Sequence, residues 1–559
     1  MSSRPSMSPS EAYKYGTGAF QTGQYDQALK YLQNVKHPDA QHLAALSAQK
    51  LGKTELAAKL FKKAAALAPN ASNIANNRGH FELERGRARQ AETYFKQALS
   101  ITPTLLGARI GLAKICAASS DWAAAIDAWQ IVLAQSPQSP TGRYGLATAY
   151  FETGQVEQAV KIYEPLLQEK DAPEIAFMLA RAYLALNQLD AAQRLFENAH
   201  SRLNDADTLR NLANLYWMRG DQAGFDRLIE TAPEGLRLTC INLILETGDL
   251  TRADALWAET FATTTPSGEG WILKSMLARL AGDAGTAHQA ARQALKLSPD
   301  NRTASDALIV SQLMTADSDA AYKSLAPLRR KEPEAQHWIA HETVADRLQQ
   351  SPSGLLEVER FIRAYDIETP PGYDSLDAFN TDFVKLLKEW HPLAARPLNQ
   401  SLRRGTQTTR DLLDSEHPVI TAYRAALDGP IRAYLDAIGT DNDHPTSARN
   451  QHDYRFAGMW SVKLNGRGYH ESHVHPAGWI SSAYYVAVPD GIDTAPDKAG
   501  WIDFGVPPYQ TGSDALTPLK TIAPRPGRLV LFPSFMWHGT RPIADDGERI
   551  TAPFDLLPA

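Results

Sequence analysis

The sequence predicts a multidomain α + β protein, in which an N-terminal all-α solenoid of helical hairpins precedes a C-terminal jelly roll or closed barrel with flanking helices. Two observations support this fold class. A pattern with an interval of 34 residues recurs through the first 335 residues, and beyond residue 456 Gly, Pro and Asp separate short aromatic and aliphatic runs. The interval is typical of stacked helix pairs, and frequent short strands are typical of barrels.

Composition excludes several classes of protein. The 559 residues exceed one ordinary core, and a net charge of −6 gives no reason to expect nucleic acid or an anionic membrane as partner. No apolar run approaches the length of a membrane span, and the N-terminus shows no signal peptide, so we expect a cytoplasmic protein. The two cysteines, Cys116 and Cys240, lie in helical patterns, which favours small buried residues over a disulfide or thiolate site.

The repeat pattern keeps step in three columns. A small turn residue, an alanine and an aromatic residue recur at Gly52, Gly86, Ser120 and Gly154, at Ala57, Ala91, Ala125 and Ala159, and at Phe61, Phe95, Trp129 and Tyr163. Less regular copies follow near Asn187, Gly220, Gly248, Gly282 and Ala321. The pattern resembles the tetratricopeptide repeat and gives about nine or ten stacked units over residues 1–335. The resemblance implies a concave groove that binds a peptide or a partner protein.

The repeat pattern ends near residue 335. Residues 336–365 still have a helical pattern and are expected to form a linker or cap, and "ETPPGYDS" then breaks the chain. Residues 366–559 are predicted to form a second domain. It begins with two or three amphipathic helices in residues 377–440, and five to eight strands follow from Phe456 onward.

The stretch "YHESHVHPAGW" places three histidines within six positions of this second domain. In a strand, residues two apart share a face, so His473 and His475 are expected to project together while His470 points away. Pro476 would end the strand and leave the pair at a barrel rim. We therefore expect His473 and His475 to be metal ligands and His470 to be a bystander or an outer-sphere group.

Two later segments supply further candidates. His538 ends an apolar strand, and Arg549 follows eleven residues later in "ERITAPF". Thr551 lies two residues beyond Arg549 and shares its strand face. A buried arginine needs an anionic partner, and a carboxylate held by both arms of the guanidinium would satisfy it.

These segments resemble the iron(II)- and 2-oxoglutarate-dependent oxygenases, and more narrowly an oxygenase family often fused behind tetratricopeptide repeats in bacteria. The similar blocks are "RPLNQSLRRGTQTTRDLL", "HVHPAGWISSAYYVAVP" and "PRPGRLVLFPSFMWHGTRPI". The resemblance implies a double-stranded β-helix that hydroxylates an unactivated carbon with Fe(II), 2-oxoglutarate and O2. On this basis His473, His475 and His538 are the metal ligands, Arg549 and Thr551 bind 2-oxoglutarate, and Tyr485 joins them, although barrel packing would also explain it.

One departure leaves the ligand set open. The usual set is two histidines and one carboxylate, and His475 stands where the family has the carboxylate. Either three imidazoles hold the metal, or Glu471 or Asp503 contributes a carboxylate. Simpler interpretations are that the histidines only form hydrogen bonds, and that Arg549 pairs with Glu548 or Asp555.

The sequence thus predicts a 2-oxoglutarate-dependent dioxygenase, acting as a hydroxylase, whose repeats recruit a peptide or protein substrate or partner. The repeats could instead dimerise the enzyme or tether it to an assembly. One alternative is a repeat scaffold with a catalytically inactive barrel. Another is a three-histidine, cupin-like metalloenzyme, but "PAGWIS" after His475 lacks the glutamate that cupins place there. A three-histidine zinc hydrolase would leave Arg549 and Thr551 unexplained.

Overall fold

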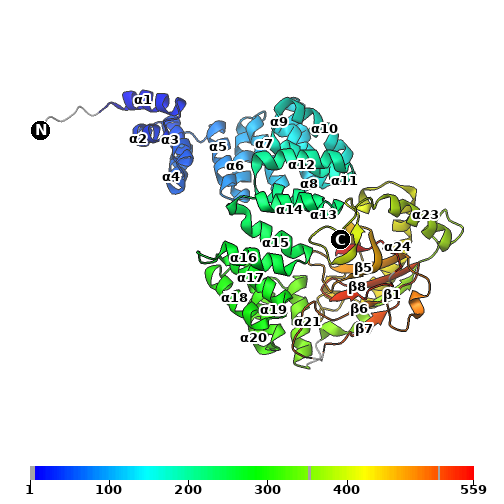
Figure 1. Cartoon of the computed structure of the whole chain (residues 1–559). Coiled ribbons are helices and arrows are strands. Elements are labelled where there is room, and N and C mark those ends of the chain that lie inside the picture. The colour runs from blue at the N-terminus through cyan, green and yellow to red at the C-terminus, as the bar shows by residue number, and fades with distance from the viewer. Residues whose placement is uncertain (1–6, 351–353, 514–515, 545) are drawn as a thin grey trace. The chain divides into compact units, whose positions relative to one another are not determined.

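The computed structural model describes residues 7–350, 354–513, 516–544 and 546–559 (Figure 1). It contains two compact units, Met1–Ala182 and Tyr183–Ala559, and each is described by itself. Within the described ranges, no helix is both long enough and apolar enough to cross a membrane.

The first unit consists of paired antiparallel helices. They are α1 (Pro9–Gln21), α2 (Tyr25–Leu32), α3 (Pro38–Lys50), α4 (Thr54–Leu67), α5 (Ser72–Glu84), α6 (Ala88–Ile101), α7 (Leu106–Ala118), α8 (Trp122–Gln135), α9 (Pro140–Glu152) and α10 (Val156–Lys170). Helix α11 (Pro173–Ala185) runs across the boundary into the second unit.

The three sequence columns have the predicted structural roles. Turn residues Gly52, Gly86, Ser120 and Gly154 all adopt positive φ, between 57° and 76°, which reverses the chain between helices and favours glycine. The alanines Ala57, Ala91, Ala125 and Ala159 are fully buried, and the aromatic residues after them are at most 3 % exposed. At Gly145 a Cβ atom would lie 2.2 Å from the Trp129 ring, so the absence of a side chain there lets an aromatic residue of the preceding helix approach.

The second unit begins with the less regular repeats. Its solenoid helices are α12 (Leu189–Leu203), α13 (Ala206–Arg219), α14 (Gln222–Thr231), α15 (Arg237–Thr247), α16 (Leu250–Thr260), α17 (Gly268–Leu280), α18 (Ala284–Leu297), α19 (Arg302–Met314), α20 (Ser318–Lys331) and α21 (Gln336–Leu348). The same positive-φ turn recurs at Asn187, Gly220, Gly248, Gly282 and Ala316. Ala321 is fully buried five residues after the last of these turns, as Ala57 is after Gly52. The predicted all-α solenoid is therefore confirmed.

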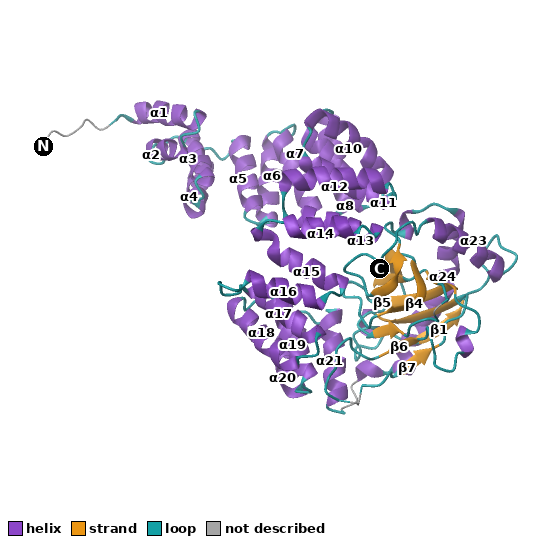
Figure 2. Ribbon diagram, viewed as in Figure 1, coloured by secondary structure: helices purple, strands orange, loops and turns teal. Residues whose placement is uncertain are grey.

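Antiparallel strands and a few helices form the rest of the second unit (Figure 2). The helices are α22 (Val358–Phe361), α23 (Leu376–Glu389) and α24 (Pro418–Ile438). The strands are β1 (Arg363–Asp366), β2 (Leu402–Gln407), β3 (Tyr454–Met459), β4 (Val462–His470), β5 (Ile480–Ala487), β6 (Ile502–Phe504), β7 (Lys520–Ile522), β8 (Arg528–Pro533), β9 (His538–Thr540), β10 (Arg549–Thr551) and β11 (Phe554–Pro558).

Two sheets make up the predicted jelly roll. The larger runs β1-β8-β5-β10-β4-β2, with β11 pairing β5 and β3, and the smaller runs β7-β6-β9. Two details correct the sequence expectations. Residues 363–365 lie in a stretch expected to be helical but belong to β1, which pairs with β8. Strand β2, which pairs with β4, lies within residues 377–440, for which two or three helices but no strand were predicted.

The larger sheet is covered on one face by its own helices. Tyr423 and Tyr434 of α24 are fully buried with Tyr484 and Leu529 of the sheet, and the Tyr423 hydroxyl donates to the carbonyl of Ala552 at 2.6 Å. This packing covers one face of β5 and β8. Side chains on their other face, such as Tyr485 and Val530, belong to a buried cluster that includes residues of α21.

The last solenoid helices share a second core with the barrel. Trp338 and Ile339 of α21 belong to one buried cluster with Phe504, Phe532 and Tyr485. In addition, the indole of Trp537 donates to the carbonyl of Ala340 at 3.0 Å. Because this core is shared, the barrel and helices α19–α21 are parts of one folded body. The domain boundaries at 335 and 365 stay predictions.

Candidate metal centre

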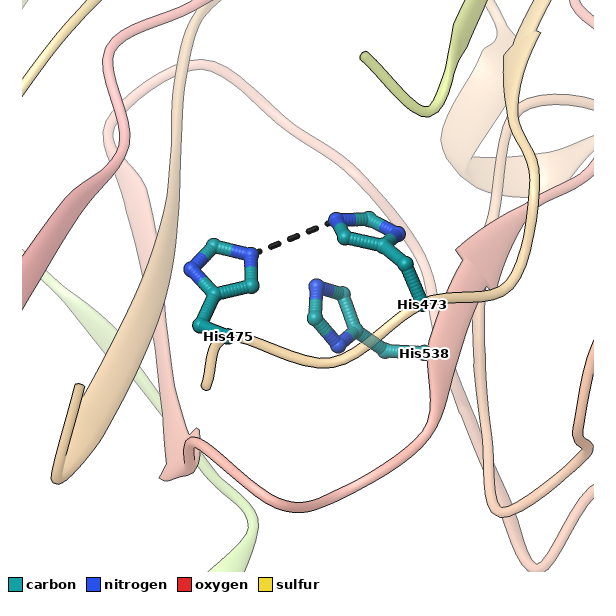
Figure 3. A group of neighbouring side chains, drawn as sticks. All are labelled: His473, His475 and His538. Atoms are coloured by element: carbon teal, nitrogen blue, oxygen red, sulfur yellow. Dashed lines mark hydrogen bonds between the residues drawn. The ribbon is translucent and has the colours of Figure 1, made fainter. Parts of the chain in front are cut away.

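Three histidines from two segments of the barrel lie close together (Figure 3). His538 begins β9, whereas His473 and His475 lie in the loop after β4 rather than in a strand. The premise that these two share a strand face is therefore wrong. His473 pairs instead with His538 through two backbone hydrogen bonds of 2.9 and 3.1 Å, and the amide of His475 donates to Ser534 at 2.9 Å.

Each imidazole is oriented through its Nδ1 atom. Nδ1 of His473 lies 2.8 Å from the carbonyl of Glu471, and Nδ1 of His538 lies 3.0 Å from the carbonyl of Met536. Nδ1 of His475 lies 2.7 Å from the carboxylate of Asp555. Carbonyls and carboxylates only accept hydrogen bonds, so each Nδ1 carries a proton and each Nε2 presents a lone pair.

The Nε2 atoms have the spacing of ligands around one ion. Those of His473 and His475 are 3.2 Å apart, and one ring nitrogen from each of the three histidines lies within 4.8 Å of the others. Two nitrogens bound to one metal at about 2.1 Å, with 90–110° between the bonds, would be about 3.0–3.4 Å apart. Two facing lone pairs repel each other without a cation, so this arrangement favours a metal over hydrogen bonding alone.

Burial keeps two of the imidazoles, those of His473 and His538, uncharged. It lowers the pKa of His473 to about 3, with His475 adding to the effect, and it holds the pKa of His538 well below its usual range. Metal binding needs neutral imidazole, so the two groups are ready to act as ligands at neutral pH without losing a proton.

His470 does not point away from the site, contrary to the strand argument. Its ring stacks on that of His473 with 5.8 Å between centroids. The Ser401 hydroxyl lies 3.2 Å from Nδ1 of His470 and 3.3 Å from Nε2 of His473. His470 is therefore a neighbour of the three histidines, linked to them through Ser401.

Neither carboxylate considered from the sequence joins the three histidines. Glu471 forms an ion pair with Arg403, and Asp503 accepts from Arg541 at 2.9 Å and from Thr521 at 2.7 Å. Among the described residues, the group that could hold a metal consists of the three histidines alone. The geometry therefore favours the three-imidazole alternative.

Arg549 is buried beside this group, and among the described residues it has no acidic partner. It is 2 % exposed, and its two terminal nitrogens donate to the carbonyl of Gly500 at 2.8 Å and to the Thr540 hydroxyl at 3.3 Å. Its Nε has no partner. The acids that could have paired with it are engaged elsewhere, since Glu548 pairs with Lys388 and Asp555 with His475. The simple salt-bridge interpretation is therefore wrong.

Two further groups accompany Arg549. The Tyr485 hydroxyl is buried without a hydrogen-bond partner, and the Arg549 guanidinium lies 5.9 Å from the centre of the Tyr485 ring. Arg549 and Thr551 both line the cavity, whereas Ile550 between them is in the core. A buried cation and an unpaired hydroxyl are costly unless an anion is bound between them.

All these groups line one cavity of about 1410 Å³. Its walls include the three histidines, Arg549 and Tyr485, and also Leu245 of α15 and Met276 and Leu280 of α17. The solenoid half of this unit therefore contributes directly to the cavity over the histidines.

Comparison with protein families gives this arrangement a context. Residues 458–555 match the family described as "Putative 2OG-Fe(II) oxygenase", and residues 42–105 and 117–172 match two tetratricopeptide-repeat families. The chain is thus similar to tetratricopeptide-repeat families over parts of its solenoid and to the family described as a putative 2OG-Fe(II) oxygenase over part of its barrel. A search of curated proteins gives no match.

Solved structures of repeat proteins are similar to part of this chain. A tetratricopeptide repeat protein from Parabacteroides merdae is 17 % identical, with 43 % of this chain and 98 % of that chain covered and a TM-score of 0.33. The type IV pilus biogenesis factor PilW is 20 % identical, with coverages of 36 % and 97 % and a TM-score of 0.34. TTC0263 of Thermus thermophilus is 21 % identical, with coverages of 32 % and 100 % and a TM-score of 0.27.

Sequence reasoning missed Asp555 as the partner of His475. If the three histidines bind iron, we expect Asp555→Ala to lower the affinity of the protein for iron by about 10- to 100-fold, because a carboxylate behind a ligating histidine fixes its tautomer and orientation. The iron affinity of Asp555→Asn, which keeps an acceptor oxygen, should lie between the affinities of Asp555→Ala and the unchanged protein. Equilibrium competition with a metal chelator measures the affinities.

Asp503→Asn is the matched control. Asp503 is a carboxylate that the sequence suggested as a metal ligand, but in the structure it accepts hydrogen bonds from Arg541 and Thr521. The iron affinity of this variant should equal that of the unchanged protein. Loss of iron in Asp503→Asn together with full affinity in Asp555→Ala would reverse the assignment.

Proposed function

We propose that this chain is an iron(II)- and 2-oxoglutarate-dependent dioxygenase that hydroxylates a peptide or protein substrate. The proposal is carried by one observation: three imidazoles bring one ring nitrogen each close together, beside a buried guanidinium that has no carboxylate partner among the described residues. The match to the oxygenase family over residues 458–555 supports it.

The residues present fit both groups. His473, His475 and His538 would hold Fe(II), since imidazole is a suitable ligand for iron. Arg549 would bind the distal carboxylate of 2-oxoglutarate through the unpaired part of its guanidinium, with the Tyr485 hydroxyl and Thr551 alongside. When bound, iron and 2-oxoglutarate supply the chemistry in which O2 converts R–H and 2-oxoglutarate to R–OH, succinate and CO2.

The chain's own residues prepare the site for this reaction. Asp555 and the carbonyls of Glu471 and Met536 keep the three Nε2 atoms free of protons. The Thr540 hydroxyl accepts a hydrogen bond from Arg549, and Thr540 lies two residues after His538 on strand β9. This short strand therefore links the histidine group to the arginine. The solenoid and barrel walls would limit the access of water to the metal.

Tetratricopeptide repeats generally mediate protein–protein interactions, and this is the basis for a peptide or protein as the recruited substrate or partner. Dimerisation or tethering through the repeats is the alternative role. The cytoplasmic location stays a prediction from the sequence.

Anaerobic titration of the purified protein with Fe(II) and then 2-oxoglutarate tests the proposal. We expect iron to be retained at one ion per chain, followed by a weak visible charge-transfer band on addition of 2-oxoglutarate. If iron is not retained and no band forms, the dioxygenase assignment fails and the repeat scaffold with an inactive barrel replaces it. If the metal is retained but 2-oxoglutarate causes no change, a cupin-like metalloenzyme is favoured.

A further inference from the structure

The cavity over the histidines is larger than a small substrate requires. Its volume is about 1410 Å³, whereas pockets for small molecules usually occupy about 300–1,000 Å³. 2-Oxoglutarate would fill a minor part of this space. The remainder is sufficient for several residues of a polypeptide in extended form.

One wall of the cavity is an apolar surface of the solenoid. Met276 and Leu280 lie one helical turn apart on α17, and Leu245 comes from α15, which packs against α17. Leu280 is 48 % exposed although it faces a cavity. An exposed leucine on a concave apolar wall favours a binding surface for another apolar group.

The facing wall is a barrel loop that α21 holds in place. Pro507, Pro508 and Tyr509 of this loop line the cavity. Arg347 of α21 donates a hydrogen bond to the carbonyl of Gly505 and another, of 2.7 Å, to the carbonyl of Thr517. These contacts anchor the chain on both sides of residues 507–509.

A second set of contacts fixes the middle of the loop. The Tyr509 hydroxyl lies 3.2 Å from Nδ1 of His341, whose Nε2 lies 2.8 Å from the carboxylate of Asp306 on α19. Both walls are therefore attached to the solenoid, and the width of the cleft between them is fixed by the fold.

Several polar groups of the cavity suit a peptide backbone. Its amide side chains, which can both donate and accept hydrogen bonds, are Asn399, Gln400, Gln407 and Gln510. Among the charged lining groups, Arg403 and Glu471 are paired with each other, and Asp555 is engaged with His475. Glu246 of α15, which accepts from Asn242, and Arg279 of α17 also line the solenoid wall, and Arg549 is reserved for the cosubstrate in the proposed function.

We propose that the cleft between helices α15 and α17 and the loop 505–513 binds an extended polypeptide segment, and that Leu245, Met276 and Leu280 accept an apolar side chain next to the hydroxylated residue. This inference rests on the proposed dioxygenase function. The solenoid is then a part of the active site that selects the residue to be modified, in addition to any recruiting role of its groove. The reaction converts one C–H bond of the segment to C–OH, with O2 and 2-oxoglutarate consumed and succinate and CO2 released.

The test uses the full chain and synthetic libraries of unstructured dodecapeptides, each with one central position fixed as Leu, Glu or Lys and the other positions random. The readouts are succinate formation and peptide products heavier by one oxygen atom. Burial of a leucine side chain is favourable whereas burial of an unpaired charge is not, so the Leu library should be turned over at least about tenfold faster than the Glu and Lys libraries. A mixture of free amino acids should not stimulate succinate formation.

The decisive variant is Leu280→Glu, which should reduce turnover of the Leu library and shift the preference to the Lys library. Leu297→Glu is the matched control, because Leu297 is a 54 % exposed solenoid leucine outside the cavity, and its preference should be unchanged. Equal preferences in Leu280→Glu and the unchanged protein would overturn the inference, as would stimulation by free amino acids equal to that by peptides.

The charge-transfer band is recorded first in each preparation, so that two kinds of failure are distinguished. If the unchanged protein lacks the band, the dioxygenase function itself fails. If the band is present but no library stimulates succinate formation, only the polypeptide cleft is overturned.

Discussion

Replacing His538 by alanine abolishes iron binding while the barrel remains folded; this is the largest effect that we expect from a single substitution. His538 supplies one of three converging Nε2 atoms, and among the described residues no fourth histidine, cysteine or carboxylate joins the group. With two imidazoles left, an ion would be held mainly by water. Iron content after desalting measures the result, and circular dichroism shows whether the fold persists.

His470→Ala is the control that separates ligands from neighbours. His470 stacks on His473 and contacts Ser401, but it is not one of the three converging histidines. We expect this variant to retain one iron per chain. Retention of iron by His538→Ala together with its loss in His470→Ala would show that the metal lies on the other side of His473.

The three histidines that the sequence singled out lie close together in the structure, but the local structure used to select two of them was incorrect. Alternation along a strand selected His473 and His475, but both lie in a loop. They converge because His473 pairs with the backbone of His538 and His475 with that of Ser534. These contacts join segments more than 50 residues apart, and a local pattern does not encode them.

The same limit explains what the sequence did not predict. Asp555 reaches His475 because β11 pairs with β5, with Asp555 opposite Ser481, and a pairing of strands over 70 residues apart leaves no periodic signal. The contribution of Met276 and Leu280 to the cavity likewise depends on a shared core between solenoid and barrel. The repeats were predictable because their columns recur every 34 residues and each unit contacts its neighbours.

Arg549→Ala should weaken 2-oxoglutarate binding by about 10- to 150-fold, which corresponds to the 1.5–3 kcal/mol of a charge-assisted hydrogen bond. The physical reason is that Arg549 is a buried cation with an unpaired Nε and, within the part of the chain that the structure describes, no carboxylate partner. Iron binding should be unchanged, because the group that would hold the metal consists of three histidines and does not include Arg549. The charge-transfer band, titrated with 2-oxoglutarate at saturating iron, measures the affinity.

Two further variants show whether the effect belongs to this guanidinium. Arg549→Lys should restore part of the affinity only, since an ammonium group keeps the charge but lacks the planar pair of donors. Arg541→Ala removes a nearby arginine that pairs with Asp503 outside the cavity, and its 2-oxoglutarate affinity should equal that of the unchanged protein. If Arg549→Ala binds 2-oxoglutarate normally, the carboxylate is anchored by another residue. A loss in Arg541→Ala as large as in Arg549→Ala would mean that a general change in charge, rather than a specific contact, governs the binding of the cosubstrate.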